Sequence, residues 1–119
     1  MRTMQLLDDL KFQDENPVAD PIYVDKDGRI LRFCLKPQQS IVEHSVPHSP
    51  FYVVVLKGRG IFTDGSGRAE TMEPNSLMVF DPGESHSVRA LDEELVFVGF
   101  LHGAPSMREG RVGGELGRS

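Results

Sequence analysis

Four histidines give this chain its clearest capacity for chemistry, and two of them lie close together. His44 and His48 are four residues apart in the stretch EHSVPHSPFYVVVLKGRG, which ends at Gly60. On a helix, two histidines at this spacing share one face and often bind a metal ion. Pro47 and Pro50 exclude an ordinary helix here. A strand and a bend must therefore position these two histidines.

Strand alternation predicts that two histidines face the interior. Successive side chains of a strand point to opposite faces. The two expected inward faces are Val42, His44 and Val46 in SIVEHSV, and His86, Val88 and Ala90 in HSVRAL. Neutral imidazoles that converge in a dry pocket suit a transition metal. The alternative is a pair of core histidines that hydrogen-bond to backbone or water.

Three further residues have less certain roles. His48, in the proline-rich connection, is either a ligand that curls over the barrel mouth or an exposed loop histidine. Glu84 is either a carboxylate ligand or a solvated turn residue. A tight turn at residues 92–94 would place His86 opposite Gly99, and His102 would then point away from the site.

The elements that must position these histidines are short strands. Prolines and glycines interrupt the chain every few residues, and Val, Ile and Phe fill the runs between them, a pattern typical of an all-β sandwich or barrel. The expected strands are Ile22–Val24, Arg29–Leu35, Ser40–Val46, Phe51–Leu56, Gly60–Thr63, Arg68–Met72, Leu77–Phe80, His86–Leu91 and Leu95–His102.

The rest of the chain is divided around this barrel. We expect an N-terminal segment over residues 1–21, with one short helix at residues 4–11 capped by Thr3, a barrel over 22–104 and a flexible, glycine-rich tail over 105–119. FYVVVL is apolar at every position, so both faces of that strand should be covered. One cover would be the opposite sheet, and the other a second subunit, which predicts a homodimer.

Composition narrows the class of protein. The chain has 119 residues, 39% hydrophobic and 26% charged, enough for one domain with one core. A net charge of −5 argues against a nucleic-acid partner. No apolar stretch approaches the length of a membrane span, Asp8 and Asp9 interrupt any signal peptide, and the single Cys34 excludes an internal disulfide. A cytoplasmic location is expected.

Two segments, PQQSIVEHSVPHSPFYVVVLKGRG and SLMVFDPGESHSVRA, together resemble the two motifs of the cupin superfamily. The whole chain is similar to the small, single-domain, RmlC-like members of that superfamily. The family motifs read G-x5-H-x-H-x3/4-E-x6-G and G-x5-P-x-G-x2-H-x3-N. His44 and Gly58 match the first, and Gly83 and His86 match the second. The resemblance implies a double-stranded β-helix, or jelly-roll barrel, whose motif histidines and glutamate hold one divalent metal.

The match departs from the family pattern at four positions. The second motif-1 histidine, the glutamate, the motif-2 proline and the final asparagine correspond here to Val46, Phe51, Asp81 and Ala90. Two of the four usual ligands are thus replaced. His48 is the candidate substitute for the ligand missing at Val46, which would give a site of His44, His48 and His86.

A site made only of imidazoles predicts one divalent transition metal, Zn, Fe, Ni, Cu or Mn, rather than Mg or Ca. Two functions from different classes follow. The first is a metal-dependent enzyme acting on a small organic molecule, with coordination positions left open for substrate. The second is a non-catalytic domain that binds or senses a small ligand, with or without metal.

Overall fold

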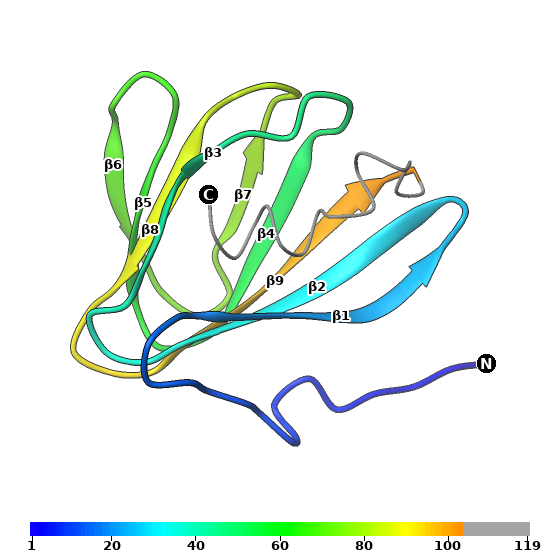
Figure 1. Cartoon of the computed structure of the whole chain (residues 1–119), viewed down its shortest axis with the longest axis horizontal. Helices are drawn as coiled ribbons and strands as arrows, with labels where there is room; N and C mark the ends of the chain where they lie inside the picture. Colours follow the sequence, from blue (N-terminus) through cyan, green and yellow to red (C-terminus); the bar gives the residue numbers. More distant parts are fainter. Residues whose placement is uncertain (104–119) are drawn as a thin grey trace.

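The computed structural model describes residues 1–103, which form two antiparallel β-sheets facing each other (Figure 1). The predicted tail over 105–119, like residue 104, lies outside the described residues. The strands are β1 (Val18–Asp25), β2 (Gly28–Leu35), β3 (Ser40–His44), β4 (Phe51–Lys57), β5 (Gly60–Thr63), β6 (Ala69–Met72), β7 (Leu77–Phe80), β8 (His86–Ala90) and β9 (Leu95–His102). Each lies where the sequence predicts one, with ends shifted by a few residues.

The strand order makes this a jelly roll, as predicted. One sheet has the order β1-β2-β9-β4-β7, and the other has β3-β8-β5-β6. Consecutive strands β3 and β4, and again β8 and β9, lie in different sheets, so the chain crosses repeatedly between the layers. The pairing expected between His86 and Gly99 is therefore wrong, because Gly99 pairs with Leu31 and Val53 instead.

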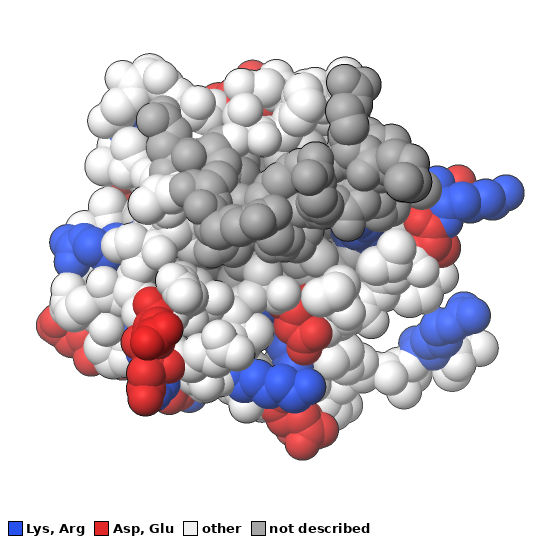
Figure 2. Space-filling model, in the orientation of Figure 1, with Lys and Arg blue, Asp and Glu red and all other residues white. Residues whose placement is uncertain are grey.

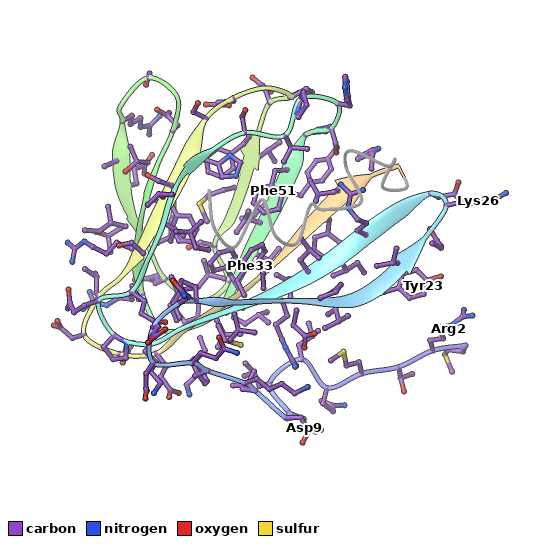
Figure 3. The ribbon with its side chains drawn as sticks, viewed as in Figure 1. Arg2, Asp9, Tyr23, Lys26, Phe33 and Phe51 are labelled. Carbon is purple, nitrogen blue, oxygen red and sulfur yellow. The ribbon has the colours of Figure 1, made fainter. Side chains whose placement is uncertain are left out.

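Side chains from both sheets fill the space between the layers. On β4 the burial alternates, with Phe51, Val53 and Val55 inward and the residues between them partly exposed. Phe33 and Phe97 stack at 4.6 Å between ring centroids. Figure 3 shows the labelled Phe33 and Phe51 between the two sheets. The histidine region is thus enclosed by aromatic side chains rather than by an open channel.

Turn residues set the close approach of strands at the base of the barrel. Gly58 joins β4 to β5 with a φ of +75°, where an L-residue would be strained. A Cβ at this position would also lie 2.0 Å from the carbonyl oxygen of Glu94. Only glycine fits this turn, which agrees with its match to the closing glycine of motif 1.

The N-terminal segment crosses the outer face of the five-stranded sheet without forming a helix (Figure 1). The predicted helix over residues 4–11 is wrong. The buried guanidinium of Arg32 donates through Nη1 to the carbonyls of Leu6 and Asp8 at 3.1 and 3.0 Å, and through Nη2 to that of Asp9 at 3.2 Å. These carbonyls accept from Arg32 instead of from a helical turn.

Two strands at the edges of the sheets carry irregularities. In β3 the register shifts between Ile41 and His44, which pair with Val88 and His86, so that one extra residue stands in β3. Ile41 is buried and Val42 is 56% exposed. The predicted inward orientation of Val42 is wrong. In β1 a similar shift occurs between Pro21 and Tyr23.

The surface carries charges of both signs. On the face seen in Figure 2, the coloured side chains of the described residues lie scattered around the rim, acidic beside basic, without a single-sign patch. Within residues 1–103 the structure has no helix long and apolar enough to cross a membrane.

Candidate functional site

The site begins with His86, whose imidazole is buried between two phenyl rings. It is 6% exposed, and its ring centroid lies 4.9 Å from that of Phe51 and 4.6 Å from that of Phe80. Both pairs are stacked, at interplanar angles of 24° and 29°. This histidine lies inside the barrel, as strand alternation predicts, and its ring has little freedom to turn.

A backbone carbonyl determines which tautomer the neutral His86 ring adopts. Nδ1 of His86 lies 3.2 Å from the carbonyl oxygen of Glu84. A carbonyl oxygen can only accept, so Nδ1 must carry the proton and donate it. In the neutral ring the lone pair is then on Nε2, on the other side of the imidazole. Histidines that ligate metals commonly have their second nitrogen held in this way.

The backbone brings His44 directly opposite His86. The two residues are register partners where β3 pairs with β8. Val42 faces outward, and the extra residue between Ile41 and His44 brings His44 into register with His86. His48 lies in the turn after β3 and is exposed. Among the residues whose side chains are described, no group of three or more His, Cys, Asp or Glu is arranged to hold a metal ion.

Phe51 fills the interior at the position that corresponds to the family glutamate. The space beside His86 is about 10 Å³, bounded mainly by phenyl rings and aliphatic side chains. A buried water needs roughly 10–15 Å³, so this space holds one water at most. Phe51 is a core residue, 4% exposed, and its role as a plug beside His86 is one that sequence reasoning did not assign to it. The signal was the replacement of a polar ligand by a large apolar residue.

Glu84 belongs to the turn between β7 and β8. Its Oε1 accepts from the backbone N–H of Asp81 at 2.9 Å, and its Oε2 accepts from that of Gly65 at 3.4 Å. The carboxylate thus joins this turn to the one after β5. Its backbone carbonyl, rather than its carboxylate, contacts His86. These contacts favour the turn role over the ligand role among the two considered.

Residues at the end of β9 form a polar junction that sequence reasoning missed. The backbone N–H of His102 donates to Oγ of Ser49 at 2.8 Å, and Ser49 is buried. The His102 ring points the other way, with Nε2 at 3.1 Å from the Tyr52 hydroxyl. The predicted orientation of His102 away from the site is confirmed. Ser49 ties the β3–β4 connection to β9, and with it the segment that carries His48.

Comparisons with solved structures support the same fold. An uncharacterized protein with a double-stranded β-helix domain from Klebsiella pneumoniae is 18% identical, with a TM-score of 0.81 over 87% of this chain and 91% of that one. TT1209 from Thermus thermophilus is 17% identical, with a TM-score of 0.82 over 88% and 100%. A predicted oxalate decarboxylase from Thermotoga maritima is 25% identical, with a TM-score of 0.61 over 66% and 68%.

Comparison with protein families completes this picture. No curated protein matches the chain. The family model described as the Cupin domain matches residues 31–100, the part that runs from β2 through most of β9 and includes both motif histidines. With the jelly-roll topology, the motif glycine at the β4–β5 turn and the match over more than half its length, the chain belongs to the cupin family.

Proposed function

We propose that this protein binds one divalent transition-metal ion through His86 and His44, without an organic substrate inside the barrel. The observation that carries the proposal is the hydrogen bond from Nδ1 of His86 to the carbonyl of Glu84. A donating Nδ1 puts the lone pair of the neutral ring on Nε2, and neutral imidazole is the form that binds metals. The buried position of the ring adds a low-dielectric environment that favours coordination by neutral nitrogens.

The second ligand follows from the ladder. Residues directly opposite in an antiparallel pair have Cβ atoms about 4.5–5.5 Å apart on the same face. His44 and His86 are register partners in the ladder, and on this pairing we propose that β3 and β8 each supply one ligand to the ion. Such an ion would connect β3 to β8, and as a Lewis acid it would polarise whatever ligand occupied its open positions.

The remaining positions are assigned to water or to a histidine from the turn. His48 is exposed in the β3–β4 connection, and its recruitment would require that connection to fold over the barrel mouth. We therefore propose His48 as a secondary ligand, less important than the other two. Two or three nitrogen ligands without a carboxylate favour Zn, Cu or Ni over Mg or Ca.

The narrow interior argues for a binding role rather than turnover. A space of about 10 Å³ beside His86 admits no organic molecule with the side chains as they lie. Even oxalate, the substrate suggested by the name of the Thermotoga maritima protein, is larger than one water. Phe51 and Phe80 would both have to move to admit it. We therefore propose that this cupin binds metal at His86 and catalyses no reaction there.

Metal analysis of the purified protein tests the proposal. Protein grown with added Zn²⁺ or Ni²⁺ should contain one ion per chain. After the metal is removed with a chelator, isothermal titration calorimetry with the same ions should give the same stoichiometry. His44→Ala and His86→Ala should each abolish that binding, whereas His48→Ala should weaken it. Affinity should fall below about pH 6.5, because protons then compete for the imidazoles.

A specific pattern would refute the proposal. Wild-type protein that takes up no metal under these conditions would leave His86 as a core histidine with a backbone partner. Stoichiometric metal retained by both His44→Ala and His86→Ala would place the ion elsewhere. Circular dichroism of each variant is the control, because loss of folding would also abolish binding.

A further inference from the structure

The N-terminal segment covers only part of the outer side of β2 and β9. Val98 of β9 is 2% exposed, although it lies outside the core cluster between the two sheets. Its register partner on β2, Arg32, is equally buried and donates to three carbonyls of the N-terminal segment. Two residues further along β9, Phe100 is 36% exposed. The cover is therefore incomplete beyond Val98.

A hollow of about 490 Å³ lies where this cover is incomplete. Met4 and Leu6 of the N-terminal segment form one wall, and Ile30 and Phe100 of the sheet belong to the other. Small-molecule sites in proteins are typically concave, mostly apolar and roughly 300–1,000 Å³ in volume. The hollow thus has room for a small organic molecule, which the space beside His86 does not.

The polar groups of the hollow come from the first residues of the chain. Arg2 and Thr3 both belong to its lining, and of the described residues that line it Arg2 alone is charged. The Arg2 guanidinium lies 5.6 Å from the centroid of the Tyr23 ring, and Figure 3 shows both side chains at the same end of the molecule. The Tyr23 hydroxyl donates to Oδ2 of Asp25, which is not part of the lining. A guanidinium and a hydroxyl are therefore the groups placed to donate hydrogen bonds to an anion.

We infer that this hollow binds an apolar monocarboxylic acid, such as a medium-chain fatty acid. Its hydrocarbon chain would lie between the N-terminal segment and the sheet, and its carboxylate would accept from Arg2 and Thr3. One guanidinium matches one negative charge. An organic cation would meet Arg2 as a like charge, and a doubly charged phosphate would add repulsion from a chain whose net charge is −5.

The site is separate from the proposed metal site. His86 stacks on Phe51 between the two sheets, whereas the hollow lies on the outer side of the five-stranded sheet. The hydrocarbon chain supplies most of the affinity, because each methylene group that leaves water strengthens binding about fourfold. Arg2 adds orientation and selects the anion over the corresponding alcohol.

Calorimetric titration of the full chain with octanoate, well below the concentration at which it forms micelles, is the first test. One molecule should bind per chain, and hexanoate, two methylenes shorter, should bind about tenfold more weakly. Arg2→Gln should weaken octanoate about fivefold, as expected for a partly exposed ion pair, and should leave the binding of 1-octanol unchanged. Arg59→Gln, at an exposed position away from the hollow, is the matched control. No binding of octanoate, or an equal loss in both variants, would overturn the inference.

Methyl resonances of methionine locate the bound acid. With methyl-¹³C-methionine in the protein, octanoate should shift the resonance of Met4, which lines the hollow, and not that of Met78, which belongs to the core between the sheets. Met4→Leu and Met78→Leu assign the two signals. Ile30→Trp should fill the hollow and abolish the Met4 shift while far-UV circular dichroism stays that of the wild type. A shift at Met78 alone would place the acid inside the barrel, and undiminished binding to a folded Ile30→Trp would exclude the hollow.

Discussion

The ring of Phe51 occupies the space that a side chain at Gly99 would need. A Cβ built on Gly99 would lie 2.3 Å from Cε1 and 2.5 Å from Cζ of that ring. The same ring stacks on His86. A glycine in the middle of β9 therefore makes room for the phenyl group that closes the barrel beside the candidate ligand.

Substitution of Gly99 by alanine should show that the packing of the Phe51 ring requires a glycine at this position. We expect Gly99→Ala to destabilise the protein by about 1–3 kcal/mol, because the added methyl group overpacks a filled interior. Phe51→Ala alone should cost about 3–5 kcal/mol through the cavity that it leaves. The measurement is urea unfolding followed by far-UV circular dichroism, because the chain has no tryptophan whose fluorescence could report unfolding.

The double variant supplies the control. In the Phe51→Ala background, Gly99→Ala should cost far less than it does alone, because the atoms that it would meet are gone. The two effects are thus strongly non-additive. Simple additivity within about 0.5 kcal/mol would mean that the ring of Phe51 does not limit the space at Gly99.

Substitution of Phe51 by glutamate should strengthen metal binding. The position corresponds to the family's metal-ligating glutamate, and its present ring contacts that of His86. A carboxylate there would add a charged ligand, but in the absence of metal it would be a buried charge and would destabilise the fold. We expect a lower melting temperature than wild type without metal, and a larger rise on addition of Zn²⁺. Phe51→Gln is the control, and an equal rise in both variants would count against carboxylate ligation.

Arg32 should prove necessary for the N-terminal segment to stay in place. Its side chain is buried and donates to three carbonyls of that segment. Each hydrogen bond from a charged donor contributes about 1.5–3 kcal/mol to the free energy of unfolding. Arg32→Lys should therefore lower stability and make residues 1–15 sensitive to limited proteolysis, because one ammonium cannot reproduce the planar fork. Arg59→Lys, at an exposed position, is the control, and equal sensitivity in both variants would refute the role.

Asp64 should make the stability of the β5–β6 turn depend on pH. The hydroxyl of Ser66 donates to Oδ1 of Asp64 at 2.7 Å, and the backbone N–H groups of Ser66 and Arg68 also donate to it. These bonds lower the pKa of Asp64 below its ordinary value. Because the folded pKa is the lower one, the stabilisation is complete above about pH 5 and is lost as the pH falls through the folded pKa.

Thermal unfolding between pH 2 and 7 measures this effect. The difference in melting temperature between wild type and Asp64→Ala should be largest near neutral pH and should shrink in acid. Asp64→Asn keeps an acceptor but cannot ionise, so its own melting temperature should lack this acid-dependent component. A wild-type advantage over Asp64→Ala that stays constant down to pH 2 would contradict the assignment.

The strands could be predicted from the sequence because their ends are marked by local chemistry. Asp and Gly at residues 25–28, and again at 64–67, and the glycine at 58 dictate turns within a few residues of where they occur. Which strands share a sheet is a different matter. His86 was expected opposite Gly99 because β8 and β9 are consecutive, yet they lie in different sheets. Pairing over such a connection depends on packing of the whole chain, which no local pattern encodes.

The candidate site could be predicted in part. Alternation in β8 correctly placed His86 inside, because β8 is regular. In β3, Val42 faces outward, and the extra residue between Ile41 and His44 brings His44 into register with His86. The N-terminal segment was expected to be helical, but its carbonyls bind Arg32, a residue more than twenty positions away. Contacts of that range override the weak helix propensity of a short segment.

The irregularities at the sheet edges also affect how the protein behaves at high concentration. An open edge strand exposes unpaired N–H and C=O groups that can recruit another chain and start fibril growth. β1 and β3 are edge strands, and each is interrupted: β3 by its extra residue, β1 by its register shift and by Pro21, which cannot donate a hydrogen bond. These interruptions should weaken edge-to-edge pairing between chains through β1 and β3.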